Sequence, residues 1–171
     1  MGLIIQLTKQ ELATCKQSAA LRWQLARMSG VVNQRRDSRS DDAIDYLGIR
    51  AEQAVAKAFN IPYSPAALGI DAGIDMFCGD LSIDVKSTFT NGEMLLAKSK
   101  EAVRADILFM VREKDEDLME LVGWIRSSRF IDEAEKKDLG HGMGWMVHES
   151  RLARPAQFWE LITQRQHGVT A

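Results

Sequence analysis

The sequence predicts a single domain of mixed α/β (α+β) class, with a mixed sheet of about four to five strands flanked by helices. Three observations lead to this prediction. The chain has 171 residues, a length typical of one domain. Its composition, 46% apolar and 27% charged, is that of a globular protein. Stretches with helical periodicity alternate with short runs that favour strands. No apolar run approaches the roughly 18 residues of a membrane span, so no membrane association is expected.

A helix is expected first, over residues 8–28. Thr8 and Glu11 form a T-x-x-E capping box, and Gly30 stands where a glycine often ends a helix. Apolar residues that recur at helical spacing predict a buried stripe: Leu12, Cys15, Ala19, Trp23 and Ala26. The polar stretch that follows, up to residue 40, predicts an exposed loop.

A second helix is expected over residues 42–60, with Asp41 or Asp42 as its N-cap. Pro62 then interrupts the chain. Two short apolar runs, 73–79 and 81–89, meet at Gly79-Asp80 and predict an antiparallel hairpin.

The rest of the chain predicts further strands and closing helices. Strands are expected over 105–111 and 118–125, a helix near 128–139, a strand over 145–150 and a last helix from Pro155. The predicted domain therefore has three parts: an N-terminal helix and basic loop (8–40), a core (42–126) and closing helices with a strand (127–171).

Charge and cysteine content narrow the class of protein. There are 22 basic and 24 acidic residues, a net charge of −2, which excludes a polycation that binds nucleic acid by bulk charge. Cys15 and Cys78 match neither a zinc spacing nor a disulfide framework, which favours the reducing cytoplasm. The apolar N-terminal stretch lacks the basic residues of a signal peptide.

Four residues form the candidate site. Lys86 follows Asp84 by two positions in a strand, so the two side chains share a face. The hairpin would bring Asp75 close to Asp84, and two such carboxylates repel each other unless a cation lies between them. Oxygen ligands alone suit Mg²⁺ or Mn²⁺. Glu52 lies on the apolar side of the second helix, where a carboxylate is costly unless it is paired or bound to metal.

These residues resemble the PD-(D/E)XK nuclease superfamily, the restriction-endonuclease-like fold. The resemblance covers residues 42–126 and rests on the helix GIRAEQAVAKAF, the segment GIDAGIDMFCGDLSIDVKST and the strands ADILFMV and LVGWI. It implies an αβββαβ core, here preceded by an extra helix.

By motif position, Asp75 matches the first acidic ligand, Asp84 the (D/E) position and Lys86 the lysine. Glu52 matches the helix glutamate that many members carry. Ile74 replaces the proline of the motif, and Asp71 is a rival for the first ligand.

The implied activity is metal-dependent hydrolysis of DNA phosphodiester bonds, by an endonuclease or a junction-resolvase-like enzyme that could act as a homodimer. Mg²⁺ or Mn²⁺ would be held by Asp75, Asp84 and the carbonyl of Val85, while Glu52 would hold a second metal ion or order its water. Lys86 would orient or deprotonate the attacking water, or neutralise charge in the transition state. The alternative is a non-catalytic DNA- or protein-binding module on the same fold, and RNA stays open as a substrate.

Basic residues outside the motif are candidates for nucleic-acid contacts. Arg35, Arg36 and Arg39 could form an arm that contacts phosphates or simply a solvated loop. Lys98 and Lys100 could likewise reach backbone phosphates or lie in a solvated turn.

Overall fold

The structure is a computed structural model that describes residues 2–28, 40–65, 73–138 and 142–168. In chain order its elements are β1 (Leu3–Gln6), α1 (Lys9–Met28), α2 (Asp41–Phe59), β2 (Met76–Cys78), β3 (Leu81–Thr88), β4 (Met94–Ala97), β5 (Ile107–Glu113), β6 (Leu118–Arg126), α3 (Ser127–Glu133), β7 (Glu135–Asp138), β8 (Met143–His148), the 3₁₀ turn η1 (Glu149–Arg151) and α4 (Pro155–Gly168). The predicted mixed α/β class is confirmed. Within the described residues, no helix is both long and apolar enough to cross a membrane.

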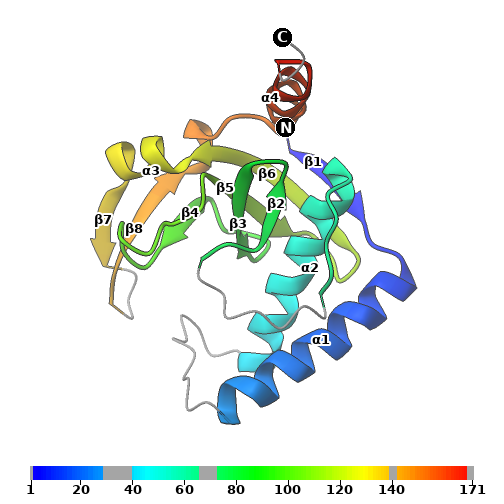
Figure 1. The fold of residues 1–171 in the computed structure, drawn as a ribbon. Helices are drawn as coiled ribbons and strands as arrows, with labels where there is room; N and C mark the ends of the chain where they lie inside the picture. The colour runs from blue at the N-terminus through cyan, green and yellow to red at the C-terminus, as the bar shows by residue number, and fades with distance from the viewer. Residues whose placement is uncertain (1, 29–39, 66–72, 139–141, 169–171) are drawn as a thin grey trace.

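The strands form two sheets (Figure 1). A five-stranded sheet has the order β1-β6-β5-β3-β2, and a three-stranded sheet has the order β4-β8-β7. The large sheet is mixed because β3 and β5 are parallel, whereas its other neighbours are antiparallel. The predicted hairpin is present as β2 and β3, with Gly79 in its turn at φ +62°. A positive φ is one that glycine adopts at little cost, which suits a tight turn.

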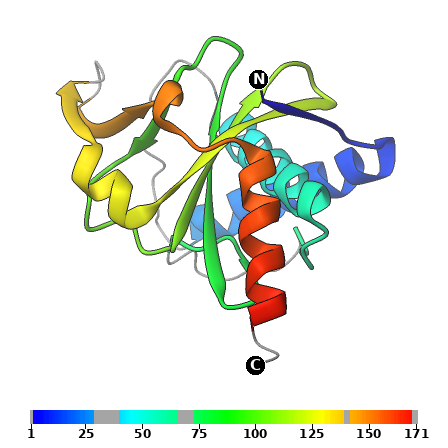
Figure 2. The same ribbon diagram turned by 90° about the horizontal axis from the view of Figure 1, so that it is seen from above.

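Each face of the large sheet carries an apolar layer. Helices α2 and α4 cover one face, where Val55 and Phe158 belong to the same buried cluster as Ile83 of β3. The small sheet and α3 contribute to the cluster on the other face, which includes Leu108 of β5 and Phe130 of α3. Figure 2 shows α4 alongside the large sheet and well separated from the small one. Since strand side chains alternate between faces, neighbouring β3 residues enter different environments.

The αβββαβ order implied by the resemblance differs from the observed order. Between α2 and the end of β6 the chain forms β2, β3, β4, β5 and β6, and residues 73–126, all described, contain no helix. The crossover between the parallel strands β3 and β5 contains β4, which joins the small sheet through β8. A strand of the second sheet therefore stands where the resemblance implies a helix.

Two expected boundaries are wrong. The N-cap of α2 is Ser40, not Asp41 or Asp42, so the helix begins earlier than predicted. The helix expected over 128–139 ends at Glu133, and residues 135–138 form the edge strand β7. The sequence of β7, EKKD, has low strand propensity, but pairing with β8 outweighs it. Charged residues on such an edge also hinder pairing with other chains.

Two strands were not predicted from the sequence. The N-terminal LIIQ forms β1, which pairs antiparallel with β6. The segment MLLA forms β4, which pairs with β8 about fifty residues later in the chain. Both strands are only four residues long, too short for an alternating pattern to identify them.

The capping box predicted for α1 is present. The Thr8 amide donates to Oε2 of Glu11 at 2.6 Å, and the Glu11 amide donates to Oγ1 of Thr8 at 3.2 Å. Oε2 of Glu11 also accepts from Nζ of Lys57 at 2.8 Å, which joins the start of α1 to the end of α2. The box therefore stabilises one helix and its contact with the next.

Thr8→Ala should lower the free energy of unfolding by about 1 kcal/mol, because the Glu11 amide loses its acceptor at the helix start. Urea denaturation measures this difference. The control is Thr14→Ala on the same helix, where the hydroxyl donates only to the carbonyl of Gln10 and the effect should be much smaller. Equal stability losses in the two variants would contradict this assignment.

Candidate functional site

A cleft of about 450 Å³ runs along the C-terminal half of β3. Ile44 and Leu47 of α2 line one wall, and Leu96 of β4 with the following Lys98 lines the opposite wall. Between these walls β3 contributes residues 84–88, which include Asp84 and Lys86. The predicted (D/E)-x-K residues therefore lie in the cleft.

The cleft exists because β2 is shorter than β3. Strand β2 pairs only with Leu81–Ile83, whereas β5 pairs with β3 along residues 83–88. Beyond Ile83, β3 thus has a strand on one side only, among the residues that the structure describes. The backbone on the other side faces the cleft, and we call it the open edge of β3 (residues 84–88).

Asp84 and Lys86 form an ion pair at the open edge. Oδ2 of Asp84 lies 2.7 Å from Nζ of Lys86. Asp84 is only 3% exposed, whereas the Lys86 side chain is 36% exposed. Their register partners on β5 are Leu108 and Met110, both fully buried, so the pair lies beside apolar groups that strengthen the attraction between its charges. The period-two spacing predicted this shared face.

Asp75 approaches the same edge from the start of β2. Its amide donates at 2.8 Å to the carbonyl of Ile83 on β3. Oδ2 of Asp75 accepts from the amide of Val85 at 2.6 Å. In a strand, the N–H and C=O of one residue point to the same side, so the Val85 carbonyl also faces the open edge. Asp75 and Val85 therefore place oxygen atoms next to Asp84.

Glu52 is buried but is held by partners from other segments. Both of its carboxylate oxygens accept from the guanidinium of Arg22 on α1, each at 3.1 Å. The hydroxyl of Tyr63 donates to Oε2 at 2.5 Å. Burial and the negative charge of Glu52 raise the pKa of the Tyr63 phenol, which keeps it a protonated donor.

Arg22 carries a firmly held positive charge. Burial by itself would lower the pKa of its guanidinium, but the hydrogen bonds and charge of Glu52, with smaller contributions from Tyr63 and Asp75, hold it above its ordinary value. From sequence, Arg22 was expected only as a helix neighbour of the basic loop that contains Arg35, Arg36 and Arg39, and not as a partner of Glu52. The available signal was its place three residues after Ala19 of the predicted buried stripe, because residues at i and i+3 share a face of a helix.

The described residues contain no group of three or more His, Cys, Asp or Glu side chains arranged to hold a metal ion. Asp75 is hydrogen-bonded to the backbone of Val85, the residue that follows Asp84, while Glu52 is bound to Arg22 and Tyr63. Two carboxylates and one carbonyl still fit Mg²⁺, which commonly takes one or two carboxylates and completes its coordination with water and substrate phosphate.

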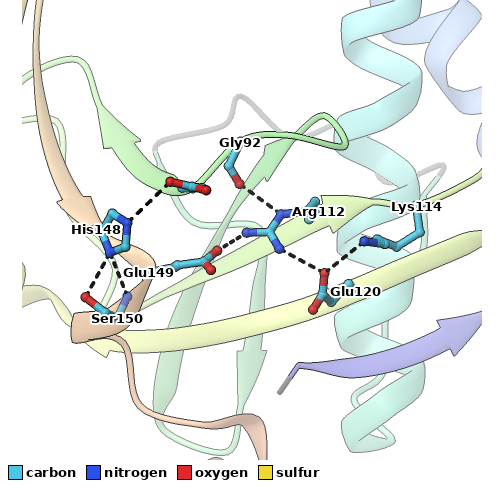
Figure 3. A network of polar contacts seen from close by, with 8 residues as sticks. Gly92, Arg112, Lys114, Glu120, His148, Glu149 and Ser150 are labelled. Carbon is cyan, nitrogen blue, oxygen red and sulfur yellow. Dashed lines mark hydrogen bonds and ion pairs between the residues drawn. The ribbon is translucent and has the colours of Figure 1, made fainter.

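Arg112 of β5 fixes to the large sheet the segment before β4, the strand whose Leu96 lines the cleft wall opposite α2 (Figure 3). Its guanidinium donates to the carbonyl of Gly92, just before β4, at 2.9 Å and to Glu120 of β6 at 3.1 Å. It also pairs with Glu149 of η1, whose amide donates to the carbonyl of Glu93 at 2.9 Å. These bonds hold the segment that leads into β4, and thereby the wall opposite α2.

The candidate nucleic-acid contacts differ in their surroundings. Lys98 is exposed and lines the cleft. Lys100 is half-buried: its ammonium donates to the carbonyl of Ile131 and lies 4.2 Å from the centre of the Trp145 ring. Four of the candidate site residues lie outside the described residues, namely Arg35, Arg36, Arg39 and Asp71, as does Gly30, which was expected at the end of the first helix.

No protein-family model matches the chain, and no curated protein matches its sequence.

Proposed function

We propose that the protein is a metal-dependent deoxyribonuclease of the PD-(D/E)XK type. The observation that carries this proposal is the convergence of Asp75, Asp84 and Lys86 at the open edge of β3, beside a cleft. Two acidic oxygens, a neighbouring carbonyl and an ammonium group are the functional groups that hydrolysis of a phosphodiester requires. The proposed enzyme is an endonuclease or is junction-resolvase-like.

Asp75, Asp84 and the Val85 carbonyl would hold Mg²⁺ or Mn²⁺. When bound, such an ion polarises a phosphate oxygen and lowers the pKa of a coordinated water. The bond from the Val85 amide to Asp75 would orient that carboxylate before substrate binds. Orientation of this kind lowers the cost of assembling the site during the reaction.

Lys86 would act directly on the substrate. An ammonium group has three donors. Asp84 faces one of them at 2.7 Å, and the side chain is exposed enough for the others to reach a phosphate oxygen or a water in the cleft. Its positive charge would stabilise the negative charge that develops in the transition state. Asp84 thus has two tasks, as a ligand and as the group that positions Lys86.

DNA would lie along the cleft, with Lys98 on the opposite wall as a phosphate contact. The net charge of −2 is an average over the chain and does not describe this local surface. Since few phosphates would be neutralised, affinity should depend on salt only moderately.

The test is cleavage of four DNA forms, namely supercoiled, linear, single-stranded and four-way-junction DNA, with Mg²⁺, Mn²⁺ or EDTA. We expect cleavage of at least one form with metal and none with EDTA. Nicking of the supercoiled form would identify an endonuclease. Single-stranded RNA is tested in parallel. If the protein binds DNA but cleaves neither the RNA nor any DNA form, the nuclease proposal is rejected and the non-catalytic binding module is favoured.

A further inference from the structure

The contacts of Glu52 bear on the number of metal ions that the site takes, a question that rests on the proposed nuclease function. By motif position Glu52 was expected to hold a second ion or order its water. In the structure its carboxylate instead faces a guanidinium and a phenol, from α1 and from the segment that follows α2.

The carboxylate of Glu52 has little capacity left for a metal ion. A carboxylate offers about four lone-pair positions. Two are used by the bidentate contact with Arg22 and a third by the hydroxyl of Tyr63. The side chain is only 7% exposed, so an ion would have to displace these donors from a site that water scarcely reaches.

Arg22 provides the charge that a second ion would otherwise provide. Its guanidinium is delocalised, remains protonated and matches the carboxylate with two parallel bonds. The charge of Asp75 contributes, less than that of Glu52, to the raised pKa of Arg22, so the guanidinium is electrostatically linked to both carboxylates. A cation of fixed position therefore already neutralises the buried charge of Glu52.

We propose that Arg22 replaces the second metal ion, so that each chain binds one Mg²⁺ or Mn²⁺, held by Asp75 and Asp84, while Glu52 serves as a positioning residue for Arg22. Glu52 and Tyr63 fix the guanidinium in place, and Arg22 lowers the electrostatic cost of gathering three carboxylates near one another. Arg22 acts through Glu52 and through its charge and is itself a positioning residue.

The experiment counts Mn²⁺ ions bound to the full chain, by calorimetry and by the loss of the electron paramagnetic resonance signal of free Mn²⁺. We expect one ion per wild-type chain and one per Glu52→Gln chain, with Mn²⁺ affinities within about threefold of each other, because Glu52 does not touch the ion. Arg22→Gln removes the charge from Glu52 and should add a second, weaker ion. Arg22→Lys should keep the count at one.

Two control variants make the count interpretable. Arg27→Gln removes the same charge from the same helix, where Arg27 lies against the ring of Trp23, and should leave one ion bound. Asp84→Asn should abolish the wild-type ion. Circular dichroism melts identify variants that fail to fold. If Arg22→Gln is one of them, the number of ions bound to Glu52→Gln by itself tests the proposal.

The outcomes separate this inference from the function on which it rests. Two ions on the wild-type chain with loss of one in Glu52→Gln, or an unchanged count of one in a folded Arg22→Gln, would overturn the role of Arg22 while leaving a metal-dependent nuclease in place. A wild-type chain that binds no Mn²⁺ would reject both proposals.

Discussion

Removal of the Asp84–Lys86 pair is expected to abolish metal-dependent cleavage. In Lys86→Met the loss should be about 10²–10³-fold in kcat, the usual cost of removing one preorganised donor to a developing negative charge. Substrate affinity should change far less, because the contact strengthens mainly in the transition state. Single-turnover cleavage of the best DNA form in Mg²⁺ measures the effect.

The double variant Asp84→Asn/Lys86→Met removes both charges together. It removes the buried carboxylate whose ion pair Lys86→Met breaks, so it should fold even where the single variant is destabilised. Its cleavage should be undetectable, since a metal ligand is lost as well. The matched control is Lys136→Met on the edge strand β7, which removes the same charge from the small sheet and should cleave like wild type. Metal-dependent cleavage that persists in the double variant would exclude this site assignment.

Phe158→Ala should produce the largest loss of stability, about 3–5 kcal/mol in the free energy of unfolding. Phe158 is fully buried at the start of α4. Its ring centre lies 4.8 Å from that of Phe59, 4.9 Å from that of Phe109 and 5.6 Å from that of Trp124. The alanine side chain would leave a cavity where α2, α4 and the large sheet meet.

Urea denaturation of Phe158→Ala is best compared with Trp159→Ala. Trp159 is the next residue of α4 but is 43% exposed, and its ring centre lies 5.5 Å from that of Phe59. We expect this second variant to lose less than half as much stability. Similar losses for both would mean that the aromatic cluster does not determine how α4 is held.

Local patterns predicted much of the fold. The capping box at Thr8 and Glu11 placed the start of α1, and the turn at Gly79 placed the β2–β3 hairpin. Both signals depend on backbone needs that residues close in sequence satisfy. Strand β7 was predicted as helix because its stability comes from β8, which no local pattern of residues 135–138 encodes.

Local patterns also predicted part of the candidate site. Asp84 and Lys86 share a face because side chains alternate along any strand, and Asp75 joins them because the hairpin returns the chain to the same edge. The sequence pattern correctly predicted that Glu52 is buried, but it did not predict that Arg22 is its partner. Arg22 lies thirty residues earlier, on a helix whose crossing of α2 depends on packing.

The sequence by itself thus determined the mixed α/β class, the principal helices, the hairpin and the shared face of Asp84 and Lys86. These follow from steric and hydrogen-bonding rules that act over a few residues. Only the tertiary structure decided that β3 keeps an open edge beside a cleft and that Glu52 meets Arg22. Those two features come from the relative lengths of paired strands and from the packing of helices, both of which involve residues far apart in the chain.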